Sequence, residues 1–491
     1  MYCKDELNLE LKRYKLDDLL LVLAKRSQDM YMKGEAIQET RFSKKIDGVV
    51  LSSEPILLPV WGLAELSWRA INSSNDYRAC IPKSDDIVKF NNLLAKVGDE
   101  KSKGTHGNKS PEEIRFHIFH GLSQTQLWWQ DLVKTRRTLV YDFLRYYLML
   151  NEMPKYFPGL KQPNEDLLEI TGFTIEDFSK LLFASYVWVT AIDPEIDFEK
   201  YPIDKELTER NPLITRENLT KCIGFFTETY GYYRQDTHVH NPIFFKPIVE
   251  TQTKRFIVAN TFIWARKFYE GIYWLVRDKY CVQNDRSFTA AFGKYYEKYI
   301  EELLKYYLKP GEFKRIIEEG NADWLIYTDK YLLIVEQKSS LMSIGLKTEY
   351  PSVEKLEEYM GNFGKACIQL QNTEETVKDA KRIKVKLILH FEKLYFRDAA
   401  FKKMVERLCG VTLKGYYFID TEEFERLIQI LSYKREAFDK IIEEKMAYED
   451  NPPPPIEGLG FENIMNKIHG WEKIKFLEQY NYIFDTITLG K

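Results

Sequence analysis

The stretch Asn321–Ser340 reads NADWLIYTDKYLLIVEQKSS. Two apolar runs, at 324–327 and 331–335, flank the polar residues 328–330. Runs of β-branched, aromatic and leucine residues on either side of a polar turn are typical of a β-hairpin. The stretch therefore predicts two antiparallel strands joined by a tight turn.

The turn sets the register of the two strands. A two-residue loop at Asp329 and Lys330 brings Asp323 opposite Glu336, and a symmetric four-residue loop gives the same pairing, whereas an odd-numbered loop does not. Residues paired in this way project from one face with Cβ atoms about 4.5 to 5.5 Å apart. Lys338 follows Glu336 by two residues and so lies on the same face.

Two carboxylates at this spacing indicate a cation site. Glu336 follows four consecutive apolar residues, 332–335, so it ends a buried strand where an unpaired carboxylate is costly. Mg²⁺, with Mn²⁺ as a substitute, fits Asp323 and Glu336 better than Zn²⁺, because the hairpin contains no His or Cys. The Lys338 ammonium would stabilise developing negative charge or help to activate a water.

The order Asp, hairpin, Glu-x-Lys resembles the active-site motif of the PD-(D/E)XK nuclease superfamily, the restriction-endonuclease-like fold. The resemblance implies that Asp323 and Glu336 bind the catalytic metal and that Lys338 serves the attacking water. The leading Pro of the family motif is absent, since Asn321 and Ala322 precede the Asp. The resemblance covers residues 287 to about 420.

Two further site residues are implied by the resemblance. Superfamily members often carry an acidic residue on the helix before the hairpin, and the predicted helix 287–308 carries Glu297 in the pattern Phe-x-x-Tyr-x-Glu, which makes it a candidate third metal ligand. Some members place a glutamine in the crossover helix, where Gln369 stands. An exposed helix glutamate and a helix-surface amide are the ordinary alternatives.

The expected fold is an α/β nuclease core, a mixed sheet flanked by helices in αβββαβ order, preceded by a large mainly helical region. Lys381, Arg382 and Lys384 are expected to bind nucleic acid beside the site, or else to form a solubilising edge. A crossover from the Glu-x-Lys strand to the next strand is expected to be right-handed and parallel. Around the hairpin we predict strands at 313–318, 384–391 and 411–419 and helices at 352–381, 399–408 and 422–431.

Four regions are expected along the chain. Residues 1–240 are mainly helical, with helices ending at Gly34 and spanning 127–150, 175–191 and 216–233, and with an exposed loop at 98–111. Residues 241–286 form a strand–strand–helix connector packed on the core, and 287–432 form the nuclease domain. Residues 433–491 form a helix, a proline-rich spacer and a tail whose amphipathic helix docks on the body or on another subunit.

Composition limits the class of protein. The 491 residues are 44% hydrophobic and 30% charged with a net charge of -3, which predicts a globular chain with several cores and only local nucleic-acid-binding surface. The six cysteines are dispersed without a C-x-x-C pair, which speaks against a zinc ribbon or a disulfide scaffold. Without a signal peptide or a long apolar run, we expect a cytoplasmic protein with no membrane partner.

The expected function is therefore that of a Mg²⁺-dependent nuclease acting on nucleic acid, DNA in preference to RNA. By resemblance, such enzymes with long extensions belong to restriction, repair or phage-defence (antiviral) systems. Two alternatives stay open: a non-cleaving nucleic-acid-binding or scaffolding subunit, and a ribonuclease. A protein partner or a homo-oligomer is compatible with each of these functions.

Overall fold

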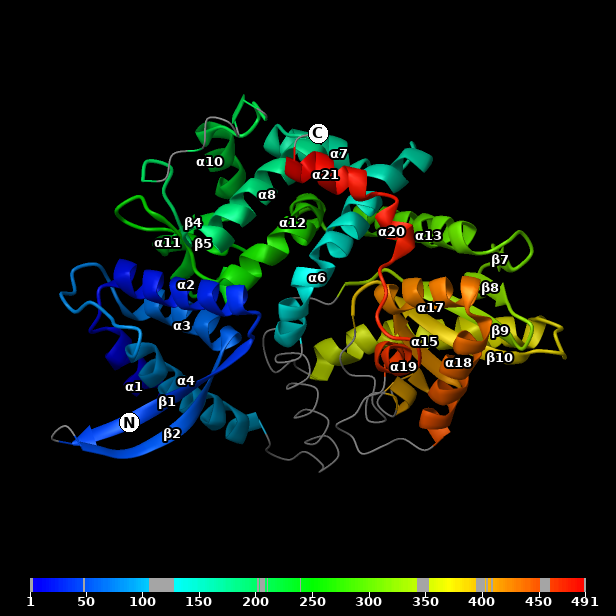
Figure 1. The fold of residues 1–491 in the computed structure, drawn as a ribbon, viewed down its shortest axis with the longest axis horizontal. Helices are drawn as coiled ribbons and strands as arrows, with labels where there is room; N and C mark the ends of the chain where they lie inside the picture. The colour runs from blue at the N-terminus through cyan, green and yellow to red at the C-terminus, as the bar shows by residue number, and fades with distance from the viewer. Residues whose placement is uncertain are drawn as a thin grey trace.

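The computed structural model describes residues 3–46, 49–105, 128–200, 203, 208–209, 211–238, 240–341, 353–393, 402, 405–407, 409–450 and 460–489. The chain is mixed α/β (Figure 1), with the N-terminal elements at one end and a five-stranded sheet with its helices at the other. Helices α6 (Trp128–Tyr147) and α12 (Thr261–Cys281) lie between these two parts. Within the described residues, no helix is long and apolar enough to cross a membrane.

The five-stranded sheet has the strand order β11-β10-β9-β8-β7. In this sheet β7, β8 and β9 pair antiparallel, and β9, β10 and β11 pair parallel. The parallel pairing expected between the Glu-x-Lys strand and the next strand is thus confirmed. The strands are β7 (Phe313–Arg315), β8 (Trp324–Tyr327), β9 (Tyr331–Lys338), β10 (Ile383–His390) and β11 (Tyr416–Asp420).

Helices cover both faces of this sheet. Helix α15 (Val353–Thr376) packs Met360, Phe363 and Leu370 against one face, where Leu332 and Ile334 of β9 are fully buried. The opposite face carries Trp324, Val335 and Leu387 and belongs to the main core. Because a buried strand must hide both of its faces, β9 reads as a continuous apolar run. The helices on this second side are α13 (Ser287–Tyr307), α17 (Thr421–Tyr433) and α18 (Arg435–Asp450).

The boundaries of several predicted elements differ from the observed ones. The strand expected at 313–318 ends at Arg315, and the strand expected at 411–419 begins only at Tyr416. The crossover helix ends at Thr376 rather than at 381. The helix expected at 399–408 falls mainly outside the described residues, as do the proline-rich spacer and the start of the tail.

The N-terminal region contains more strand than expected. Helix α2 (Leu16–Lys33) ends at Gly34 in the left-handed conformation, φ 73°, and α8 spans Ile175–Ala191, so both predicted helices are confirmed. The region is mainly helical, as expected, but it also contains an unpredicted hairpin in which β1 (Ile37–Ile46) and β2 (Val49–Pro59) pair antiparallel. The loop expected at 98–111 is helical as far as Thr105, within α4 (Asp86–Thr105).

A second, four-stranded sheet joins the N-terminal region to the predicted connector. Its order is β3-β6-β5-β4, so the two connector strands pair with strands from before residue 240. The helix expected over 216–233 is interrupted, because β4 divides it into two short helices. The elements are β3 (Glu195–Ile196), β4 (Thr227–Thr229), β5 (Ile248–Glu250), β6 (Phe256–Val258), α10 (Arg216–Gly224) and α11 (Tyr230–Tyr233).

A buried ion pair joins the N-terminal helices to the sheet layer. Arg145 of α6 donates to both carboxylate oxygens of Glu425 on α17, at 2.8 and 2.7 Å, and Tyr299 of α13 donates to the same carboxylate at 2.5 Å. Glu425 is fully buried. Since breaking a buried pair leaves one uncompensated charge, this contact fixes α6 firmly against α13 and α17.

The C-terminal segment docks on the body of the same chain, which answers the question left open by the sequence. In α19 (Phe461–Ile468), Asn466 accepts a 2.6 Å hydrogen bond from Arg426 of α17. The segment continues through α20 (Lys475–Glu478) to α21 (Asn481–Leu489). There the Phe484 ring lies 5.8 Å from Phe143 of α6 and 6.0 Å from Phe183 of α8. The segment therefore contacts both parts of the molecule.

Candidate active site

The hairpin β8–β9 has the predicted register. Tyr327 pairs with Leu332 and Trp324 with Val335, so the next pair along the ladder is Asp323 with Glu336. Successive residues of a strand alternate between faces, so Glu336 and Lys338 lie on the face covered by α15. The sequence prediction that these three side chains meet is confirmed.

Glu336 is the most deeply buried of these three residues, with 2% of its surface exposed. Burial and, after it, the negative charge of Asp323 together raise its pKa to about 8, against the opposing effect of Lys338. Among the described residues, its Oε2 atom is buried without a hydrogen-bond partner. In the ionised carboxylate a buried oxygen without a donor is costly, so the ionised form of Glu336 favours a cationic ligand.

Asp323 is fixed by the backbone of the opposite strand. The Gln337 N–H donates to Asp323 Oδ2 at 2.8 Å. Burial raises the pKa of Asp323, this hydrogen bond lowers it, and the charge of Glu297 raises it. The carboxylate is therefore held in place beside Glu336 although the two repel each other.

Lys338 connects Glu336 to the crossover helix. Its ammonium donates to Glu336 Oε1 at 2.5 Å and to Gln369 Oε1 at 2.9 Å. The Gln369 amide in turn donates to the Asn321 carbonyl at 3.2 Å. The structure thus brings Gln369 of α15 to the site, as the sequence predicted, and its two contacts orient the lysine.

Glu297 lies near the site but is engaged elsewhere. It accepts hydrogen bonds from Lys294, at 2.7 Å, and from Arg315. In the described part of the chain, no group of three or more His, Cys, Asp or Glu side chains is arranged to hold a metal ion. The described site thus contains two carboxylates, those of Asp323 and Glu336. A role for Glu297 as a third metal ligand stays a prediction.

The basic residues Lys381, Arg382 and Lys384 do not lie beside the carboxylates. Ile383 pairs with Tyr331 at the start of β9, whereas Ile388 pairs with Glu336. Five residues of strand separate the two positions, about 17 Å. The expectation of proximity is wrong, because a parallel crossover returns the chain to the opposite end of the sheet. A role for these residues in binding nucleic acid is not tested by their position.

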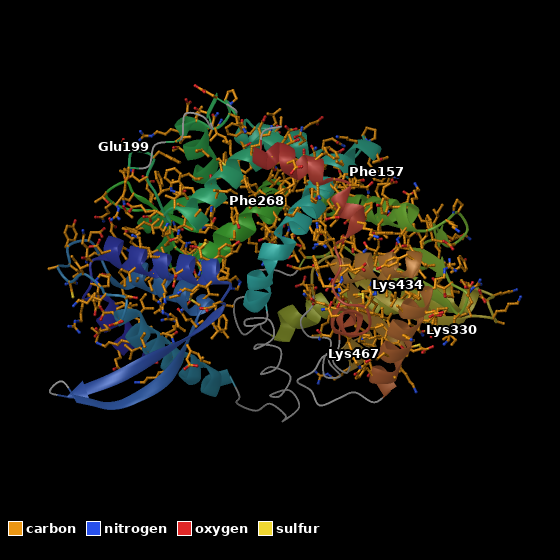
Figure 2. The ribbon with its side chains drawn as sticks, in the orientation of Figure 1. Phe157, Glu199, Phe268, Lys330, Lys434 and Lys467 are labelled. Carbon is orange, nitrogen blue, oxygen red and sulfur yellow. The ribbon has the colours of Figure 1, made fainter. Side chains whose placement is uncertain are left out.

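That end of the sheet is marked by Lys330, which is labelled in Figure 2. Arg382 donates there to the Thr328 carbonyl and, at 2.7 Å, to Asp379. Lys384 donates to the Glu374 carbonyl at 2.6 Å. Two of the three basic residues thus have partners within the chain, while Lys381 is exposed.

The oxygen atoms at the site are suitable ligands for a hard divalent cation. Asp323 and Glu336 supply only oxygen atoms, and Glu336 Oε2 is buried without a donor in the described structure. Oxygen ligands and carboxylate charge are what Mg²⁺ and Mn²⁺ require. The residues therefore fit the metal implied by the resemblance.

Three residues in or next to the site were not predicted from the sequence. The Gln337 N–H and the Asn321 carbonyl act through the backbone, so no side-chain motif marks them. His390, 1% exposed, pairs with Lys338 across β9 and β10. Its place follows from the parallel register, which the sequence does not specify across a crossover of more than forty residues.

Comparisons of the chain with protein-family models, with curated proteins and with solved structures found no match.

Proposed function

We propose that this chain is a metal-dependent nuclease that hydrolyses phosphodiester bonds of nucleic acid, with DNA as the expected substrate. The observation that carries the proposal is the meeting of Asp323, Glu336, Lys338 and Gln369 at one end of the sheet. The two carboxylates, one of which has an oxygen without a hydrogen-bond donor, would hold a cation. The ammonium of Lys338 and the amide of Gln369 lie beside them and suit an anionic substrate.

The order of elements supports the same proposal. A helix, α13, precedes the three antiparallel strands β7, β8 and β9, and helix α15 then leads to the parallel strand β10. This is the order implied by the resemblance to PD-(D/E)XK nucleases. Asp323 directly precedes the second strand, β8, and Glu336 lies in the third, β9, which agrees with the arrangement that the resemblance implies.

Asp323 and Glu336 would hold Mg²⁺, or Mn²⁺ in its place. When bound, such an ion supplies an activated water and stabilises charge on the phosphate. Lys338 donates hydrogen bonds to Glu336 and Gln369, so its ammonium is held at the place where negative charge develops. Gln369 positions the lysine, and Gln337 positions Asp323 through its backbone N–H.

The test is cleavage of plasmid, linear duplex, single-stranded DNA and folded RNA with Mg²⁺, Mn²⁺ or EDTA. Lys338→Ala should lower the rate by about 100-fold or more, the usual contribution of a positioned proton-transfer or charge-stabilising group. The matched control is Lys386→Ala, which removes a partly buried, ion-paired lysine from another position on the same face of the sheet.

Metal-dependent cutting that disappears only in Lys338→Ala supports the proposal, and the substrate that is cut identifies the nucleic acid. Cutting that survives Lys338→Ala contradicts the mechanism. Absence of cutting by the wild type on every substrate contradicts the nuclease proposal and favours a binding subunit.

A further inference from the structure

Arg315 stands on the strand beside Asp323, on the face of the sheet that α13 covers rather than the face of Glu336 and Lys338, and has no part in the motif. It pairs in β7 with Trp324, the residue that follows Asp323, and the N–H of its neighbour Ile316 donates to the Asp323 carbonyl at 2.8 Å. The guanidinium group is thus carried by the strand adjacent to the Asp323 backbone.

The guanidinium is held in a defined position. Its Nη2 donates to Glu297 on α13, and its central carbon lies 5.8 Å from the centroid of the Trp324 ring. Trp324 is fully buried, and its indole N–H donates to Gln337 at 2.8 Å. Since Gln337 also holds Asp323, a continuous set of contacts links Arg315 to the site. A side chain ordered in advance loses less entropy when it binds a ligand.

The ion pairs of Glu297 with Arg315 and Lys294 leave one positive charge in excess at the surface of the sheet. One carboxylate accepts from two cations, Arg315 and Lys294, whose side chains are 41% and 53% exposed. The centre of the site, by contrast, carries Asp323 and Glu336, which repel a phosphodiester. A substrate strand that reaches these carboxylates therefore needs a cation nearby. Burial and the charge of Glu297 raise the pKa of Asp323, so this ion-paired group acts on the site.

We infer that Arg315, with Lys294 beside it, binds a backbone phosphate of the substrate strand next to the scissile phosphodiester. The inference rests on the proposed nuclease function and adds the residue that positions its substrate. The planar guanidinium fork matches two phosphate oxygens, which a lysine ammonium cannot do in the same geometry. The plain alternative is a surface ion pair that contributes only a little to stability.

The test is binding of fluorescently labelled DNA, duplex and single-stranded, in EDTA so that no cleavage occurs. Arg315→Gln should weaken binding by roughly 10-fold and reduce the slope of log K against log salt by about one, as expected for one lost phosphate contact. In Mg²⁺, the same variant should raise KM and leave kcat nearly unchanged. Arg315→Lys should recover part of the affinity.

The matched control is Arg435→Gln. Arg435 is 46% exposed and ion-paired to Glu312, but it lies by the turn of the β8–β9 hairpin, where it also contacts Asp329 at 3.4 Å. This variant should bind and cleave as the wild type does.

Wild-type protein that fails to bind DNA, equal binding by Arg315→Gln and wild type, or equal losses in both variants would overturn the inference. Selective loss of binding without any metal-dependent cleavage by the wild type would support the phosphate contact and refute the nuclease. Metal-dependent cleavage by Arg315→Gln with an unaltered KM would support the nuclease function and refute the phosphate contact.

Discussion

Two lysine–glutamate pairs lie on the same face of the five-stranded sheet, and they differ mainly in the burial of the carboxylate. Lys338 and Lys386 are similarly covered, with side chains 20% and 13% exposed. The Glu336 side chain is 3% exposed, whereas Glu374, on helix α15, is 33% exposed. The comparison shows that burial of the acid, rather than the presence of the lysine, distinguishes the candidate site.

A second carboxylate strengthens the difference. Glu336 has Asp323 beside it, and together with burial this charge raises its pKa to about 8. Glu374 meets Lys386 at 2.7 Å near the surface, where water screens the pair. The first pair contains the carboxylate that we propose binds a cation, and the second attaches α15 to β10.

The largest effect is expected for Asp323→Asn. Loss of a metal-binding carboxylate removes several kcal/mol of charge stabilisation, so cleavage should fall on the order of 1000-fold, and Mn²⁺ binding measured by calorimetry should weaken. Glu374→Gln should change the rate by no more than about twofold, as surface substitutions usually do. Equal losses of cleavage in Asp323→Asn and Glu374→Gln would show that burial of the glutamate does not distinguish the two lysine–glutamate pairs.

Glu336→Gln should change how stability depends on pH. In the metal-free protein the pKa of Glu336 is about 8, above its ordinary value of 4.5, so the folded state holds a proton that the unfolded state has released. The free energy of unfolding should therefore fall between pH 4.5 and 8, by at most about 1.4 kcal/mol per pH unit.

Urea titrations in EDTA at pH 5 to 8 check this dependence. Glu336→Gln should flatten it, Glu374→Gln should retain it because Glu336 is unchanged, and Mg²⁺ should raise the stability of the wild type at pH 8. A wild type and a Glu336→Gln variant with parallel pH curves would contradict the raised pKa.

The smallest effect is expected for Gln369→Ala. Lys338 would keep Glu336 and lose one acceptor, so cleavage should fall about 10-fold, the cost of roughly one hydrogen bond to a charged group, with a small change in Tm. Gln371→Ala, on an exposed position of the same helix, is the control. Rescue by Gln369→Glu, which restores an acceptor, would assign the loss to orientation of the lysine. An unchanged rate would remove Gln369 from the site.

The hairpins show which parts of the fold the sequence predicts. Strands β8 and β9 are marked by apolar runs around a polar turn, and their register follows from the length of that turn. Strands β1 and β2 flank the dipeptide Asp47-Gly48, a strong hairpin signal, within a region whose helical periodicity predicts mainly helices. A local turn signal of two residues thus identifies this hairpin where the periodicity of the flanking helices does not.

The site shows a second limit. Asp323, Glu336 and Lys338 lie within sixteen residues, so local register alone brings them together. Gln369 reaches Lys338 from α15, and only the resemblance to a family indicated it. The predicted position of Lys381, Arg382 and Lys384 beside the carboxylates is wrong. Their closeness in sequence to a strand does not tell at which end of the sheet that strand begins.

The C-terminal segment also bears on how the chain is made. Helices α6 and α8 bury apolar side chains against α21, which is translated more than 300 residues after α6. At about 10 residues per second, a ribosome needs roughly half a minute to cover that distance. During that time the apolar side chains of α6 and α8 that contact α21 in the folded chain are uncovered. We therefore expect folding of the N-terminal half to depend on a factor that covers this surface at the ribosome.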